Sequence, residues 1–213
     1  MLDVQTLHPG ALAPDDMLAW RALAAAQPGF DSPLLGPDFT QAVGALRPDA
    51  RVCVFRRQGQ AVGFLPYHRQ SGGQARSIGG PFADYHGLVS APALWTNGRQ
   101  ALADAGIAAW RFTALIDPFD RFPASAGPRG HLIVPTEGAE AYLERIRAAS
   151  PKKIKNYRRL AGKLEREHGA LRLVADDHSR RAFDQLLAWK RAQLLRTGMH
   201  DFLGPDWTRD LMD

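Results

Sequence analysis

The sequence has a single cysteine, Cys53, among its 213 residues, and this scarcity excludes a disulfide framework within the chain. One thiol also cannot supply a cysteine-based metal site, which needs several thiolates. Cys53 lies in the apolar run VCVF, so we expect it to be a buried strand residue that packs as a small hydrophobic side chain. A reducing cytoplasm fits such low cysteine usage.

Long hydrophobic runs are also missing. No segment has the roughly 18–20 consecutive apolar residues that a transmembrane helix needs. The first residues, MLDVQTLHPG, lack the basic stretch and apolar run of a signal peptide. With 45% apolar and 23% charged residues, the composition is that of a folded protein with one or two domains. We therefore expect a cytoplasmic location and no transmembrane segment.

Several motifs of well-known enzyme classes are absent. No GxxxxGK[ST], GxGxxG, HExxH or GxSxG occurs, so P-loop, dinucleotide-binding, zinc-protease and α/β-hydrolase functions have no support. The seven histidines are scattered, and no two are three or four residues apart. This spacing predicts no helical metal site, and we expect no metal.

Lysine is scarce and confined, because all five lie between Lys152 and Lys190, whereas arginine is spread along the chain. Between Arg145 and Arg172 there are ten Lys or Arg and two Glu, a local charge of +8 against +5 for the whole chain. Such a segment attracts phosphates, acidic polymers or anionic surfaces. The other interpretation is a solvated helix face, and the pattern leaves both open.

The order of local signals predicts an α+β fold with a mostly antiparallel sheet flanked by helices. Prolines followed by acidic residues predict helices that begin at Pro14 and Pro37. RVCVFRR and AVGFLPYHR, joined by QGQ, predict a β-hairpin. Further strands are expected in ARSIGG, HGLVSAP, WRFTALI, HLIVP and ALRLV, and further helices over 94–105, 138–148, 150–168 and 179–197 and from Pro205.

The helix expected over 150–168 coincides with the cationic segment. Ser150 and Pro151 suit its start, and Gly169 is placed to end it. Its apolar residues recur at helical spacing and predict that one face packs; they are Ile154, Tyr157, Leu160, Ala161 and Leu164.

Asp84, Tyr85 and His86 follow one another in the segment GGPFADYHG. One interpretation is a substrate pocket in which one of these groups is a general base or a hydrogen-bond anchor. The other is a turn closed by an Asx hydrogen bond, with Tyr85 packed inward. The residues alone favour the turn, because polar clusters are common in loops.

Five segments resemble, in the same order, the CelD-type (cellulose-biosynthesis) acetyltransferases of bacteria: FDSPLLGPDF, VGFLPYHR, GGPFADYHGLV, SPKKIKNYRRLAGKLEREHG and WKRAQLLRTGMHDF. This family belongs to the GNAT superfamily and is related to the FemAB-type transferases. The resemblance covers nearly the whole chain, and it lies in the succession of segments rather than in a catalytic motif. It implies an N-terminal GNAT-like domain over 1–148, then the basic helix and the incomplete start of a second GNAT-like half over 149–213.

The resemblance further implies an N- or O-acyltransferase of exopolysaccharide, cellulose or cell-envelope biosynthesis. Acetyl-CoA or another acyl-CoA would be the donor, and a carbohydrate, amino sugar or lipid-linked molecule the acceptor. Asp84, Tyr85 and His86 are the candidate catalytic residues. The candidates for binding an anionic acceptor or the phosphates of CoA are Lys152, Lys153, Lys155, Arg158, Arg159, Lys190 and Gln193.

One departure from the GNAT pattern concerns the donor. GNAT folds hold the acyl-CoA pyrophosphate with an [RQ]xxGx[GA] loop at a helix N-terminus. The sequence has no convincing copy of this loop, which in such families belongs to the second half. We therefore expect a chain that lacks most of that half and is inactive by itself.

Two other functions stay open. The chain could be a non-catalytic module whose basic helix docks an anionic polymer, RNA or a protein partner. It could also transfer aminoacyl groups from aminoacyl-tRNA, as FemAB relatives do, and its affinity would then fall steeply with salt.

Overall fold

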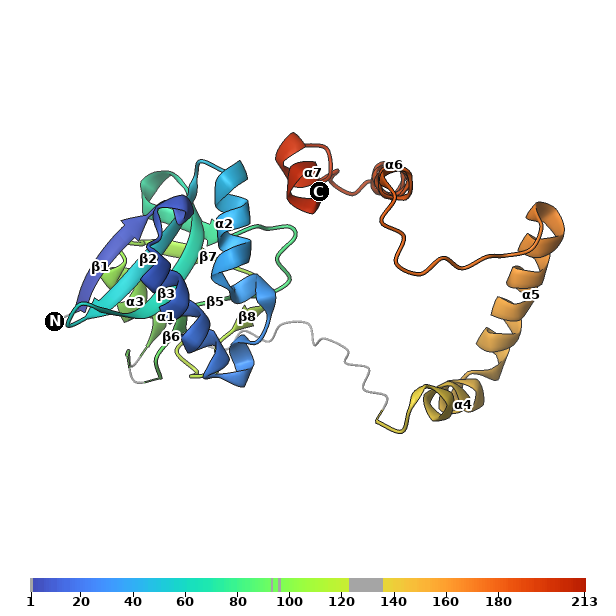
Figure 1. Ribbon diagram of the computed structural model, residues 1–213, viewed down its shortest axis with the longest axis horizontal. Helices are drawn as coiled ribbons and strands as arrows, with labels where there is room; N and C mark the ends of the chain where they lie inside the picture. The colour runs from blue at the N-terminus through green and yellow to red at the C-terminus, as the bar shows by residue number, and fades with distance from the viewer. Residues whose placement is uncertain (1, 93, 96, 123–135) are drawn as a thin grey trace. The chain divides into compact units, whose positions relative to one another are not determined.

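The computed structural model describes residues 2–92, 94–95, 97–122 and 136–213 (Figure 1). Contacts within the chain define two units, one of Met1–Gly127 with Arg191–Asp213 and one of Pro128–Lys190. The first unit contains the β-sheet and the hydrophobic cores, and the regular secondary structure described in the second is helical.

The sheet of the first unit has the strand order β1–β2–β3–β4–β7, and β6 pairs with β3. The β4–β7 pair is parallel, and the other pairs of this sheet are antiparallel. A separate parallel pair joins β5 and β8. The strands are β1 Leu2–Leu7, β2 Ala50–Arg57, β3 Gln60–Arg69, β4 Gln74–Ser77, β5 His86–Gly87, β6 Val89–Ser90, β7 Ala109–Arg111 and β8 Leu115–Ile116. The predicted α+β fold with a mostly antiparallel sheet is confirmed.

The predicted β2–β3 hairpin is confirmed. Its turn residues, Gln58 and Gly59, have φ angles of 52° and 81°, and positive φ at both central positions gives the twist that suits a tight hairpin. Side chains alternate between the two faces of the strands. Cys53, Phe55 and Leu65 are fully buried on one face, and Val52, Val54 and Phe64 are fully buried on the other.

Helices cover both faces of the sheet. The helices α1 (Pro14–Ala25) and α2 (Pro37–Leu46) lie on one face, where Trp20 stacks on Phe64 with ring centroids 4.7 Å apart. The helix α3 (Gly98–Asp104) packs on the other face and contributes Ala101 to the core around Phe55. Short 3-10 helices fall at η1 Pro9–Ala11, η2 Pro28–Phe30, η3 Pro33–Leu35 and η4 Ser71–Gly73.

One local prediction in this unit needs correction, and one strand was not predicted. The helix expected over 94–105 begins only at Gly98, because the Asn97 side chain caps it by accepting a hydrogen bond from the Gln100 N–H at 3.0 Å. Strand β1 was not predicted; it pairs with β2 along its length. The strand expected at HLIVP lies outside the described residues.

The helices of the second part of the chain follow the prediction closely. They are α4 Ala139–Ala149, α5 Pro151–His168 and α6 Arg180–Arg196, and α7 (Asp206–Met212) lies in the first unit. Gly169 ends α5 with a φ of 89°, as its position predicts. Ser150 is the N-cap residue, but its side chain makes no capping hydrogen bond.

The strand predicted at ALRLV is wrong. Residues 170–174 have no strand, and the Leu173 side chain is 93% exposed. A strand needs a neighbour to pair its N–H and C=O groups, and no described strand lies beside this segment.

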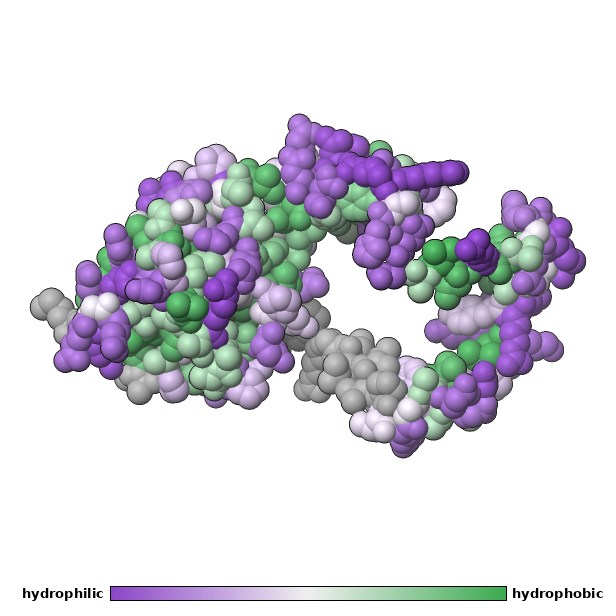
Figure 2. Space-filling view, in the orientation of Figure 1, coloured by the Kyte–Doolittle hydropathy of each residue, from purple (hydrophilic) through white to green (hydrophobic). Residues whose placement is uncertain are grey.

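The apolar stripe of α5 is exposed rather than packed. Tyr157 is 54% exposed, and Leu160 and Leu164 are each 45% exposed. Figure 2 shows hydrophobic and hydrophilic surface side by side over this helix. That one face of this helix packs therefore stays a prediction. None of the described helices combines the length and apolar character that crossing a bilayer requires.

Candidate functional site

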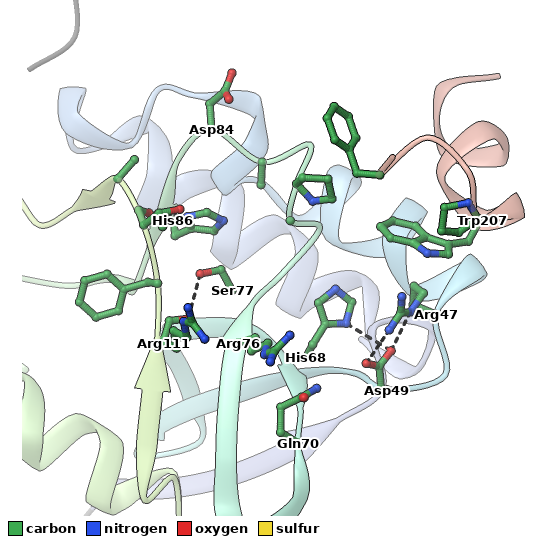
Figure 3. A pocket seen from close by; sticks show the side chains of 18 of the residues that line it. Arg47, Asp49, His68, Gln70, Arg76, Ser77, Asp84, His86, Arg111 and Trp207 are labelled. Carbon is green, nitrogen blue, oxygen red and sulfur yellow. Dashed lines mark hydrogen bonds and ion pairs between the residues drawn. The ribbon is translucent and has the colours of Figure 1, made fainter. Parts of the chain in front are cut away.

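A cavity of about 870 Å³ opens in the first unit, at the ends of β3, β4 and β7 (Figure 3). The loop 79–86 and the segment 200–207 complete its walls. Its polar lining consists of Arg47, Asp49, His68, Gln70, Arg76, Ser77, Asp84, His86, Arg111, Thr113 and His200. The lining thus has many basic and hydrogen-bonding groups and two carboxylates.

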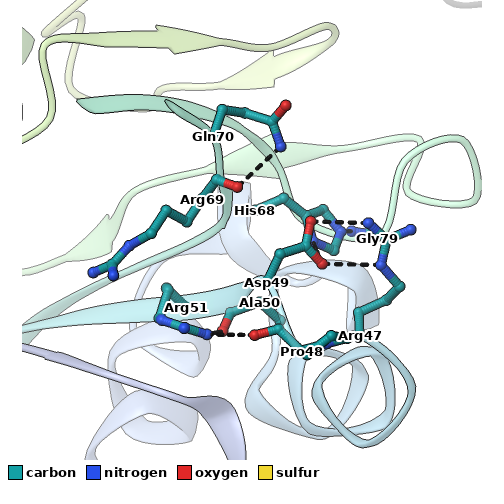
Figure 4. A network of polar contacts seen from close by, with 9 residues as sticks. All are labelled: Arg47, Pro48, Asp49, Ala50, Arg51, His68, Arg69, Gln70 and Gly79. Atoms are coloured by element: carbon teal, nitrogen blue, oxygen red, sulfur yellow. Dashed lines mark hydrogen bonds and ion pairs between the residues drawn. The ribbon is translucent and has the colours of Figure 1, made fainter. Parts of the chain in front are cut away.

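A polar network fixes one side of the cavity (Figure 4). The guanidinium of Arg47 donates two hydrogen bonds to the Asp49 carboxylate, at 2.9 and 2.8 Å. His68 Nδ1 lies 3.3 Å from Asp49 Oδ1, an ion-pair distance without hydrogen-bond geometry. Burial acts to raise the pKa of Asp49, but the hydrogen bonds and the charge of Arg47 hold this pKa below its usual value. The charge of Arg47 is therefore compensated within the protein.

His68 also tethers the loop that follows β4. The backbone N–H of Gly79 donates to His68 Nε2 at 3.1 Å. Because Nε2 accepts this bond, the ring proton of His68 belongs on Nδ1, which faces Asp49. Burial of the ring lowers the pKa of His68. His68 is thus a neutral side chain that links β3 to the loop at Gly79.

His86 lies at the opposite side of the cavity, in β5. Its Nδ1 is 2.6 Å from the backbone carbonyl oxygen of Thr113, and a carbonyl can only accept, so Nδ1 carries the ring proton. Nε2 then has a free lone pair, and it is buried without a hydrogen-bond partner in the described part of the chain. Burial lowers the pKa of His86, although the Thr113 carbonyl and the charge of Asp84 oppose this shift. The ring is therefore neutral near pH 7, with its basic nitrogen unused, which is the state that a general base requires.

The structure brings two of the three candidate catalytic residues to the cavity. Asp84 and His86 both line it, whereas Tyr85 does not and is 45% exposed. The alternative of a turn with Tyr85 packed inward is therefore wrong for Tyr85. No described hydrogen bond of the Asp84 side chain closes an Asx turn either.

Aromatic side chains join the segment 200–207 to the loop 79–86 beside the cavity. The ring of Phe82 makes edge contacts with Phe202 and Trp207, with centroids 5.8 and 6.0 Å apart. The guanidinium carbon of Arg47 lies 4.9 Å from the centre of the Trp207 ring. These contacts hold the segment 200–207 against the loop 79–86.

Sequence reasoning missed Arg47, His68, Arg76 and Arg111 as site residues. Arg76 alternates with the buried Ala75, and Arg111 follows the buried Trp110, so their direction could be read from the strand pattern. Their proximity could not, because it depends on which strands pair.

The candidate phosphate-binding residues lie on other elements. Lys152, Lys153, Lys155, Arg158 and Arg159 are exposed on α5 in the second unit, and Lys190 and Gln193 are exposed on α6. None of them lines the cavity described above. Their role in binding phosphates stays a prediction. Within the described ranges, no group of three or more His, Cys, Asp or Glu is arranged to hold a metal ion.

One family of known proteins matches part of the chain. Residues 151–213 match a family model described as an acetyltransferase (GNAT) domain. This match supports the GNAT superfamily and a general acyltransferase role, with an acyl-CoA donor. The matched part includes α5, α6 and α7, and its segment 200–207 forms part of the cavity wall. No curated protein and no solved structure matches the chain.

Proposed function

We propose that the chain belongs to an N- or O-acyltransferase that uses acyl-CoA, with a carbohydrate, amino sugar or lipid-linked molecule as the acceptor. The observation that carries this proposal is the match of residues 151–213 to an acetyltransferase (GNAT) domain. The ordered resemblance of five segments to CelD-type acetyltransferases supports a role in exopolysaccharide, cellulose or cell-envelope biosynthesis. The proposed location is the cytoplasm, where acyl-CoA is found.

The proposed acceptor site is the cavity of the first unit. Ligand pockets are typically about 300–1,000 Å³, and this cavity of about 870 Å³ is within that range. The ring of Trp207 offers an apolar surface for a sugar face, and Gln70 and Ser77 offer hydrogen-bonding groups for hydroxyls. Such a mixture suits a polar acceptor with some apolar faces.

His86 is the proposed general base. The acceptor amine or hydroxyl attacks the thioester carbonyl carbon, the new C–N or C–O bond forms, and the C–S bond breaks. His86 Nε2 takes the proton that the nucleophile loses, and the CoA thiolate leaves and is protonated to the thiol. Asp84, which lines the same cavity, stabilises the imidazolium that forms because its charge acts on His86. Tyr85, outside the lining, has no step assigned to it.

The cationic side chains of α5 are the proposed contacts for the phosphates of CoA or for an anionic acceptor. Five of them are exposed on the first three turns of the helix, at 152, 153, 155, 158 and 159. Replacing these five by Gln is expected to weaken acyl-CoA binding and to reduce its dependence on salt. Unchanged affinity in 50 and 300 mM salt would exclude this role for α5.

Two measurements test the proposal. Isothermal titration calorimetry with acetyl-CoA, on residues 1–213 and on any longer natural form, is expected to show binding. Release of the CoA thiol is then followed in the presence of amino sugars, with neutral hexoses as the hydroxyl series. If neither form binds acetyl-CoA, the acyltransferase proposal is wrong.

A further inference from the structure

Three neighbouring strands place His68, Arg76 and Arg111 in one row across the sheet. The register pairs His68 of β3 with Arg76 of β4, and Arg76 with Arg111 of β7. Residues paired in register point to the same face of a sheet. Figure 3 shows the three labelled side chains next to one another, and all three line the cavity.

The hydrophobic core on the other face of the sheet determines to which face the side chains of this row point. Ala75 and Trp110 precede Arg76 and Arg111, and they are 1% and 8% exposed in the core that contains Phe55. Because side chains alternate along a strand, burial of Ala75 and Trp110 turns both arginines toward the cavity. The row is therefore built on rigid strands rather than on a loop.

The two arginines have no negative partner in the described part of the chain. No ion pair or side-chain hydrogen bond of Arg76 or Arg111 occurs there, and residues 1, 93, 96 and 123–135 contain no Asp or Glu. The two carboxylates of the cavity act elsewhere: Asp49 binds Arg47, and Asp84 forms no ion pair with either arginine. Like charges directly opposite each other destabilise a sheet, so this pair is expected to gain stability from an added anion.

We infer that Arg76 and Arg111 form a binding site for a phosphoryl group of the acceptor. Guanidinium groups present forked donors that match the oxygens of phosphate, and two adjacent forks can share one phosphoryl group. His86 lines the same cavity, so a hydroxyl or amine of the same molecule would lie near the residue proposed as the general base. The acceptor class is therefore a phosphorylated sugar or amino sugar.

Only the assignment of the phosphoryl group to the acceptor rests on the proposed function. Binding of a phosphoryl group at the row follows from charge and register alone. The same chemistry has a second source, the phosphates of CoA, and the experiment separates the two.

The first test is calorimetric titration with inorganic phosphate and with glucosamine 6-phosphate. Glucosamine, which lacks the phosphate, is the control ligand. Arg76→Gln and Arg111→Gln are each expected to lower the affinity for both phosphate ligands by about tenfold or more, because each removes a charge-assisted hydrogen bond. Arg69→Gln is the matched control, because Arg69 follows His68 on β3, points to the other face and does not line the cavity. It is expected to leave both affinities unchanged.

A second measurement guards against variants that fail to fold. Phosphate is expected to raise the Tm of the natural chain and of Arg69→Gln, and to leave the Tm of the double variant Arg76→Gln/Arg111→Gln unchanged. Retained phosphate binding in the folded double variant, or an equal loss in Arg69→Gln, would overturn the site. Acetate that binds as tightly as phosphate would overturn the phosphoryl assignment.

Competition identifies the source of the phosphoryl group. If CoA does not displace glucosamine 6-phosphate, the row belongs to the acceptor, as inferred. If CoA displaces it from the natural chain and Arg76→Gln weakens CoA binding as well, the row binds the donor and the acceptor assignment is wrong. If acetyl-CoA binds normally and phosphate does not bind at all, the site is wrong while the proposed function stands.

Discussion

The Nδ1 atom of His86 donates a hydrogen bond to the Thr113 carbonyl oxygen at 2.6 Å, and this bond selects the ring tautomer. A backbone carbonyl cannot rotate away or ionise, so it holds the imidazole more permanently than a side chain would. The nitrogen left without a proton is Nε2, which is buried and has no hydrogen-bond partner in the described part of the chain.

Replacing His86 by Gln is expected to lower kcat for acyl transfer by about 10²–10⁴-fold, the usual contribution of a general base. Binding of acetyl-CoA is expected to stay unchanged, because His86 is proposed to act on the acceptor. The measurement is thiol release under saturating acetyl-CoA. His178→Gln is the control, since the His178 side chain is 84% exposed and outside the cavity. If His86→Gln leaves kcat unchanged, His86 is not the general base.

Stability is expected to fall as the pH drops below about 6.5. Burial lowers the pKa values of His68 and His86 in the folded state below the ordinary value of 6.5. Between the lowered and the ordinary pKa the unfolded chain binds more protons than the folded chain, so protons favour unfolding there. Urea unfolding at pH 7.5, 6.5 and 5.5 should show this loss, and the double variant His68→Gln/His86→Gln should show less of it. An equal pH slope in both proteins would contradict the prediction.

The buried ion pair between Asp16 and Arg56 is expected to matter for stability. Their atoms are 2.8 Å apart, and the side chains are 4% and 22% exposed. Asp16→Asn should lower the free energy of unfolding by about 3 kcal/mol, the low end for a broken buried pair, because Arg56 keeps some water. Asp38→Asn removes the exposed pair with Arg21 and should change it by less than about 1 kcal/mol. If both substitutions lower the free energy of urea unfolding equally, burial does not determine how much an ion pair contributes to stability.

Repulsion between Arg76 and Arg111 predicts an unusual result in buffer without phosphate. Arg76→Gln should raise the free energy of unfolding by about 0.2–1 kcal/mol at low salt, since it removes a like-charge pair from adjacent strands. Added sodium chloride should reduce the gain, because salt screens exposed charges. Arg69→Gln relieves no such pair, as its register partner is Ala75, and should give no gain. A destabilised Arg76→Gln would show that the arginine makes a favourable contact in the empty cavity.

Local signals explain which parts of the fold could be predicted. Prolines and acidic residues mark the starts of α1 and α2, and a Gln-Gly turn between alternating strands marks the hairpin. ALRLV is a short, mostly apolar run typical of a strand, but such a run cannot supply the neighbouring strand that a strand needs. LDVQTL alternates between apolar and polar residues over its first four positions, and it forms β1 because β2 is there to pair with it.

Some residues of the candidate site could likewise be predicted from the sequence, and others could not. Asp84 and His86 could be found because they are neighbours in a polar cluster, and both reach the cavity. Arg76 and Arg111 are far apart in the sequence, and only the parallel pairing of β4 with β7 brings them together. The tautomer of His86 likewise depends on Thr113, which no spacing rule connects to it.

The tether between His68 and Gly79 has a consequence for how the cavity responds to occupation. His68 belongs to the same row as Arg76 and Arg111, and its Nε2 also holds the start of the loop that leads to Asp84 and His86. Any anion that attracts a proton onto this ring would turn Nε2 from an acceptor into a donor and break the tether. Filling the row and positioning the base are then thermodynamically coupled events, and substitutions at His68 and His86 should be non-additive in a double-mutant cycle.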